Sequence, residues 1–76
     1  MNSITFQLKG DYIELIQLLK ALGIAQTGGH AKMIVDDGLV ERNGEVETRK
    51  RAKIVVGDTL LLKLEESAAI QIKIET

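Results

Sequence analysis

Apolar residues recur at every second position in three stretches of the chain, residues 4–8, 60–64 and 70–74. This period of two predicts strands that turn one face to the core. We expect the first and last of these strands to pair with each other or to extend one sheet.

Two segments after the first strand have the spacing of short amphipathic helices. Asp11 is a candidate N-cap with Glu14 in capping-box position, and Gly23 is expected to end that helix. Thr27 is expected to cap a second helix that Gly38 closes. The predicted core-facing residues are Leu15, Leu18, Leu19 and Leu22 in the first helix and Ala31, Ile34 and Val35 in the second. Each helix is too short to be stable alone, so they should pack together as a hairpin.

Asn43-Gly44 separates two strand-like segments and is typical of a type I′ hairpin turn, because both residues tolerate positive φ. Gly57-Asp58 indicates a further turn before the strand at residues 60–64. The predicted order is β-α-α-β-β-β-β, an α+β fold in which two short packed helices lie against a small, mostly antiparallel sheet. We expect residues 1–76 to form a single domain.

The composition fits a compact globular chain, with 45% hydrophobic residues and no proline. The absence of cysteine excludes disulfides and thiolate metal ligands, and it suits a reducing cytoplasm. The sequence has no signal-peptide pattern and no run of roughly 18 apolar residues. We therefore expect a soluble cytoplasmic protein that does not bind membranes.

The formal net charge of −1 is by itself evidence against a polyanionic partner, but the charges are unevenly distributed. Four of the five residues in 49–53 are basic, whereas acidic pairs such as Asp36-Asp37 and Glu65-Glu66 stand elsewhere. A basic run is usually only a solvated loop. The chain also contains a separate segment that combines glycines with basic residues, and the presence of both segments favours an anionic partner.

That second segment is Thr27-Gly28-Gly29, followed by His30 and Lys32. A helix start presents unpaired N–H groups, and glycines let a phosphate approach them closely. In the alternative interpretation Thr27 is only a cap and the glycines form a tight connection. Taken alone, the segment favours this alternative.

Catalytic groups are sparse. His30 is the only histidine, and neither Ser3 nor Ser67 lies in a nucleophile motif. We expect no enzymatic activity, no cofactor, no metal and no small-molecule substrate. The only aromatic residues are Phe6, assigned to the core, and Tyr12. Base stacking should therefore not dominate, and contacts to phosphates and 2′-hydroxyls of folded or duplex RNA are favoured.

An ordered series of motifs over residues 15–62 resembles the S-four (S4) RNA-binding domain, also called the alpha-L motif. The matching elements are residues 18–23, Thr27 with Ala31, Ile34-Val35 and Gly38, Val40 with Asn43-Gly44, and Val56-Gly57-Asp58. Residues 44–51 and 53–55 resemble the stand-alone bacterial YbcJ-like subgroup. This chain departs from the family pattern at three places. Many members carry arginine at the position of Gly28, a basic residue at the position of Met33 and Arg-Leu-Asp at positions 14–16. The two-helix segment of this chain therefore carries less positive charge than in those members.

The resemblance implies RNA binding through the start of the second helix and the basic run. We predict a bacterial, ribosome-associated monomer that contacts phosphates of structured ribosomal or transfer RNA. The predicted RNA-binding residues are Thr27, Gly28, Gly29, His30, Lys32, Arg42, Arg49, Lys50, Arg51 and Lys53. The alternative function is a protein–protein interaction module that uses Ile70–Ile74 as an edge strand.

Overall fold

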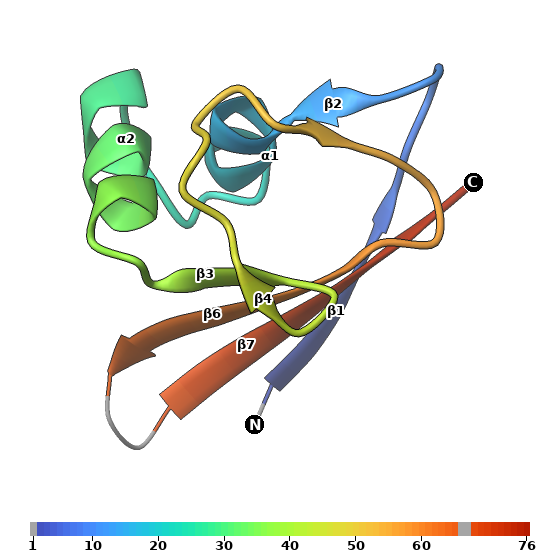
Figure 1. The fold of residues 1–76 in the computed structure, drawn as a ribbon. Helices are drawn as coiled ribbons and strands as arrows, with labels where there is room; N and C mark the ends of the chain where they lie inside the picture. Colours follow the sequence, from blue (N-terminus) through green and yellow to red (C-terminus); the bar gives the residue numbers. More distant parts are fainter. Residues whose placement is uncertain (1, 66–67) are drawn as a thin grey trace.

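The computed structural model describes residues 2–65 and 68–76, so Met1, Glu66 and Ser67 lie outside the described residues. Figure 1 shows the elements in chain order, which are β1 (Asn2–Gln7), β2 (Ile13–Glu14), α1 (Leu15–Ala21), α2 (Gly28–Asp36), β3 (Val40–Arg42), β4 (Glu45–Val46), β5 (Lys53–Ile54), β6 (Thr59–Glu65) and β7 (Ala68–Glu75). The α+β class and the two-helix arrangement are confirmed.

The main sheet has the strand order β1-β7-β6-β3-β4. The first and last strands do pair with each other, in parallel, with Asn2 opposite Ile70. The other neighbouring pairs in this sheet are antiparallel. Because β7 lies between β1 and β6, the prediction that Ile70–Ile74 forms an edge strand is wrong; β1 and β4 form the two edges.

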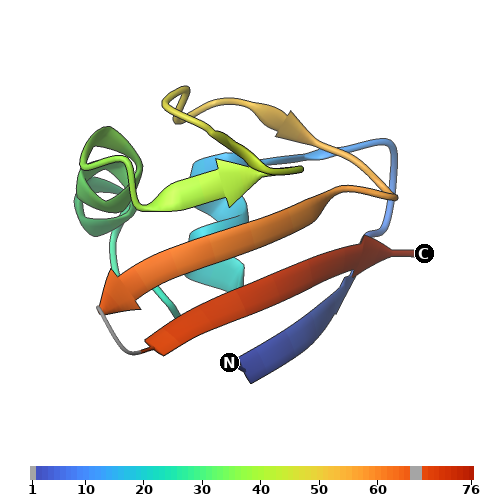
Figure 2. The same ribbon diagram turned by 60° about the horizontal axis from the view of Figure 1, so that its bottom comes forward.

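Both helices lie on one side of the main sheet, and the view in Figure 2 shows its other face without a helix. The period-two pattern explains this arrangement. Leu60 and Leu62 of β6 and Ile72 and Ile74 of β7 are buried beneath the helices, while Lys63 on the alternate face is exposed. Each fully buried leucine or isoleucine contributes on the order of 1.5–3 kcal/mol through its removal from water.

The predicted turns and the predicted cap of α2 are confirmed. Asn43 and Gly44 have φ values of 53° and 90°, which is the conformation required between β3 and β4. Thr27 Oγ1 accepts a 3.0 Å hydrogen bond from the N–H of His30 at the start of α2. Gly38 follows α2 with a φ of 73°.

The start of α1 differs from the prediction. Asp11 lies before the helix, and Glu14, the N-cap, makes no side-chain cap hydrogen bond. The N–H groups of Leu15 and Ile16 instead donate to the backbone oxygens of Ala52 and Lys50, at 2.9 and 3.2 Å. A distant segment thus replaces the local cap, because β2 pairs antiparallel with β5 immediately before the helix.

Within the described residues, neither helix has the length and apolar content needed to cross a membrane.

Candidate nucleic-acid interface

The basic loop, residues 49–53, runs from β4 to β5 and is fastened to the start of α1. Two of its backbone oxygens accept the α1 hydrogen bonds described above. Ala52 is buried and anchors the loop, whereas Arg49, Lys50, Arg51 and Lys53 are exposed. The loop therefore holds its positive charges at defined positions on the surface.

Four of the predicted RNA-binding residues surround one open hollow of about 400 Å³, here called the cationic hollow. It is lined by Arg42, Arg49, Arg51, Ala52 and Lys53. A second open hollow of about 450 Å³ adjoins it and shares two of these side chains; its lining residues are Arg42, Asn43, Glu45, Val46, Glu47 and Arg49. The structure thus brings Arg42 from β3 together with the basic loop.

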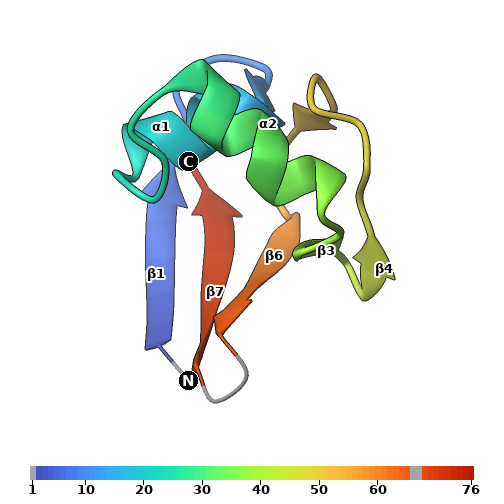
Figure 3. The same ribbon diagram turned by 90° about the vertical axis from the view of Figure 1, so that its left-hand side faces the viewer.

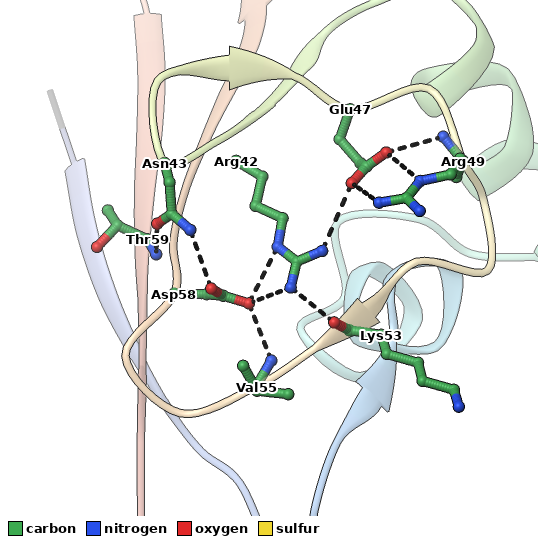
Figure 4. Close-up of polar contacts among 8 residues, drawn as sticks. All are labelled: Arg42, Asn43, Glu47, Arg49, Lys53, Val55, Asp58 and Thr59. Atoms are coloured by element: carbon green, nitrogen blue, oxygen red, sulfur yellow. Dashed lines mark hydrogen bonds and ion pairs between the residues drawn. The ribbon is translucent and has the colours of Figure 1, made fainter.

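Arg42 is held by hydrogen bonds, as Figure 4 shows. Its Nε and Nη2 donate to Asp58 Oδ2 at 3.0 and 2.7 Å, and Nη2 also donates to the backbone oxygen of Lys53 at 2.8 Å. Nη1 lies 3.6 Å from Glu47 Oε1, and 21% of the side chain is exposed. Arg42 therefore ties β3 to the end of the basic loop and has little surface left for a ligand.

Asp58 is the other centre of this cluster. It accepts a 3.0 Å hydrogen bond from the N–H of Val55 and a 3.0 Å hydrogen bond from Asn43 Nδ2. Burial alone would raise its pKa, but the hydrogen bonds from Val55, Asn43 and Arg42 outweigh burial and lower the pKa below its ordinary value of 3.8. Asp58 thus remains a carboxylate and fixes the guanidinium of Arg42.

Glu47 performs a similar task for Arg49. The backbone N–H, Nε and Nη2 of Arg49 donate to the Glu47 carboxylate at 3.2, 3.1 and 3.2 Å. The side-chain hydrogen bond from Arg49 lowers the pKa of Glu47 and raises that of Arg49. Glu47 is buried, whereas 73% of the Arg49 side chain is exposed. The guanidinium of Arg49 is therefore held in position by Glu47, while most of the Arg49 side chain remains exposed to solvent.

Acid is expected to destabilise the protein through these two carboxylates. Glu47 and Asp58 have pKa values below 4.5 and 3.8, the ordinary values they regain on unfolding. The folded protein thus binds fewer protons, and its extra stability, complete above about pH 5, is lost as the pH falls through the folded-state pKa values. Urea midpoints measured from about pH 6 to about pH 3 should decrease. In a Glu47→Gln/Asp58→Asn variant the urea midpoint should decrease less steeply with falling pH. An equally steep decrease would refute the assignment of the acid sensitivity to these two carboxylates.

The start of α2 forms a second, separate group. Figures 1 and 3 place α2 and the basic loop on the same helical side of the main sheet. Thr27, Gly28, Gly29, His30 and Lys32 do not line the cationic hollow. His30 Nδ1 accepts a 3.3 Å hydrogen bond from the N–H of Gln26, so this nitrogen is already engaged.

Neither glycine at this helix start is required by packing. A Cβ on Gly28 would meet no atom within 4 Å, and one on Gly29 would meet only Thr27 Oγ1 at 3.9 Å. Neither has a positive φ. The open space above the two residues is compatible with the approach of a ligand.

The sequence-based prediction missed three residues of this region. Glu47 and Asp58 carry no motif for orienting an arginine, and they become recognisable only when the fold brings them to Arg42 and Arg49. Tyr12 was not expected near the basic loop, yet the Nζ of Lys53 lies 4.9 Å from its ring centroid. In the described part of the chain, no group of three or more His, Cys, Asp or Glu residues is arranged to hold a metal ion.

Two helices packed on a small sheet, with the basic loop beside them, form the arrangement expected for the S4 class of domain. The family model of the S4 domain matches residues 6–73, and this chain belongs to that family. This confirms the family resemblance. Among individual proteins it is similar to YbcJ of Escherichia coli strain K12, provisionally named an RNA-binding protein, with 47% identity over 57 residues that cover 74% of this chain and 81% of the relative. YbcJ of Shigella flexneri, named as uncharacterised, matches to the same extent.

The solution structure of the E. coli YbcJ protein has the same fold. It superimposes with a TM-score of 0.64 at 40% sequence identity, covering 91% of this chain and 85% of the other. That structure is described as revealing an alpha-L motif involved in RNA binding. The predicted alpha-L architecture is therefore confirmed.

Proposed function

We propose that this chain is a non-catalytic RNA-binding protein whose cationic hollow holds phosphates of structured RNA. The observation that carries the proposal is the convergence of Arg42, Arg49, Arg51 and Lys53 on one open hollow. The description of the E. coli YbcJ structure as containing an RNA-binding motif supports the same ligand class.

The chemistry of the hollow suits phosphate better than a neutral ligand. Guanidinium groups offer planar sets of N–H donors that match phosphate oxygens. Arg49 and Arg51 are exposed on the basic loop, and Arg49 is already oriented by Glu47. Such preorganisation reduces the entropy lost when a ligand binds. Arg42 acts here by supporting the hollow more than by direct contact.

The start of α2 is proposed as a second contact, through the N–H groups near Gly28 and Gly29 together with Thr27, His30 and Lys32. Ribosomal or transfer RNA is the proposed type of RNA, and ribosome association in the cytoplasm is the proposed setting. These finer assignments follow from the family resemblance.

A triple variant, Arg49→Gln/Lys50→Gln/Arg51→Gln, tests the basic loop. Glutamine is preferable to glutamate because a new carboxylate at position 49 would face Glu47. For a structured RNA fragment such as a transfer RNA, we expect affinity to fall about tenfold or more near 0.1 M salt. The plot of log affinity against log salt should become shallower by about 2. Fluorescence anisotropy of the labelled RNA over a salt series measures both.

The matched control is Lys9→Gln/Lys20→Gln/Lys73→Gln, which removes the same charge. These lysines are exposed and are not among the residues that line the two hollows. The control should retain most of the affinity and a steeper salt dependence than the basic-loop variant. Equal losses in both variants would show that only net charge matters and would overturn the assignment of the site, provided that circular dichroism shows both folded.

A further inference from the structure

Tyr12 lies beside Lys53, which lines the cationic hollow, although Tyr12 is far from the basic loop in sequence. Tyr12 is 46% exposed, and the ammonium of Lys53 stands over its ring at 4.9 Å from the centroid. This distance is within the range of a cation–π interaction. An exposed aromatic ring thus adjoins a lysine that also lines the cationic hollow.

Strand pairing explains this contact. Glu14 of β2 lies opposite Lys53 of β5. Tyr12 directly precedes β2, and the alternation of an extended chain predicts that its side chain lies on the same side as that of Glu14, two residues later. Glu14 and Lys53 form no ion pair in the described part of the chain, although they are direct cross-strand neighbours. The ammonium of Lys53 lies over the tyrosine ring instead.

We infer that Tyr12 is a stacking platform for one unpaired base of a bound RNA, placed so that the adjoining phosphate reaches the cationic hollow. This inference rests on the proposed function and adds a base-binding position to it. The geometry matches the chemistry of a nucleotide: the ring offers a π surface for the base, and Lys53, Arg49 and Arg51 offer cations for the phosphate.

Exposed apolar residues follow β5. Val55 and Val56 are 39% and 45% exposed, and continuation of the β2–β5 register by one residue places Val55 across from Tyr12. An exposed apolar residue at this position offers a surface that a flat, poorly hydrated base can cover. The competing explanation is that the ring only fastens β2 to β5. That explanation predicts that loss of the Tyr12 ring lowers the stability of the fold but does not selectively weaken the binding of ligands that contain bases.

The test compares two anionic probes, an RNA hairpin with an unpaired loop and inorganic polyphosphate, which has no bases. Tyr12→Leu should weaken binding of the hairpin about tenfold, within the usual range for loss of one base–aromatic stack. Binding of polyphosphate should be unchanged. Tyr12→Phe keeps the ring and should retain the affinity for the hairpin. Equal effects of Tyr12→Leu on both probes, or none on either, would overturn the inference.

A second measurement keeps the phenol ring of Tyr12 in place and so avoids the effect that loss of the ring has on folding. Tyr12 is the only tyrosine, and incorporation of 3-fluorotyrosine therefore gives one ¹⁹F resonance for this site. Ring currents of a stacked base should shift that resonance upfield with the hairpin but not with polyphosphate. Identical shifts with both probes would overturn the inference.

The two proposals fail in different ways. Hairpin binding that depends on the basic loop but is insensitive to Tyr12→Leu would leave the proposed function standing and remove the stacking platform. Hairpin binding that is insensitive to the basic-loop variant would remove both.

Discussion

Asp58→Ala is expected to lower the free energy of unfolding by about 3 kcal/mol, since it removes the carboxylate that is hydrogen-bonded to the mostly buried guanidinium of Arg42 and leaves the Glu47 carboxylate, at 3.6 Å. Arg42 loses two hydrogen bonds to Asp58, and the N–H of Val55 and the amide of Asn43 each lose an acceptor. The expected loss is a large share of the stability of so small a domain, which is of the order of 5–10 kcal/mol. Urea unfolding followed by circular dichroism measures it.

Two variants make this prediction specific. Asp58→Asn keeps the shape and one acceptor oxygen, so its loss should be smaller, about 1–2 kcal/mol. Asp36→Ala removes an exposed aspartate at the end of α2 and should change stability by less than about 0.5 kcal/mol. If Asp58→Ala were as mild as Asp36→Ala, the cluster around Arg42 would contribute little to holding β3, the basic loop and the turn before β6 together.

Ile54→Ala should lower stability by a similar amount, about 3 kcal/mol, because it leaves a cavity in the core. Ile54 is 0% exposed and belongs to β5, directly after the basic loop and opposite Ile13 of β2. Loss of its side chain should loosen the contact between the loop and α1. We expect faster amide hydrogen exchange at Leu15 and Ile16, which donate to loop oxygens, together with the lower urea midpoint.

The neighbouring Val55 provides the matched control. Val55 is 39% exposed, and Val55→Ala leaves the backbone N–H that donates to Asp58 in place. This variant should change stability by no more than about 0.5 kcal/mol. Comparable losses from the two substitutions would contradict the view that burial of Ile54, and not the strand propensity of this segment, fixes the loop.

The parts of the fold with a local cause were predictable from the sequence. The alternation in β1, β6 and β7 depends only on one buried face, and the turn at Asn43-Gly44 depends only on the φ values these two residues tolerate. The cap at Thr27 is likewise local. Each feature follows from neighbouring residues, so no knowledge of the tertiary structure was required.

The pairing of β1 with β7 was one of two expected arrangements, but two other features that depend on distant residues were missed. The two-residue strands β2 and β5 are too short to have a pattern of their own, and their pairing replaces the expected cap at Asp11. β7 lies inside the sheet because β1 pairs with its outer side. The alternative that residues 70–74 form an edge strand did not take this pairing into account. In both cases the hydrogen-bond partners of the backbone N–H and C=O groups are residues far away in the sequence, which a pattern of neighbouring residues does not reveal.

The candidate site shows the same division. The basic run was evident from charge alone, but its association with Arg42 in one hollow required the strand order. Arg42 was predicted to bind RNA, whereas its contacts indicate a supporting role through Asp58 and Glu47. The position of Tyr12 beside Lys53 depends on the pairing of β2 with β5.

The parallel pairing of β1 with β7 has a consequence for biosynthesis. Among the described strands, β1 is translated before all others, yet its partner in the sheet is β7, which follows all others. Local units such as the β3–β4 hairpin can form early, while the contacts of β1 require closure of a loop that spans nearly the whole chain. Until β7 emerges from the ribosome, β6 presents an open edge with the alternating leucines 60, 62 and 64. A nascent or truncated chain without β7 should therefore be the form most exposed to aggregation and proteolysis.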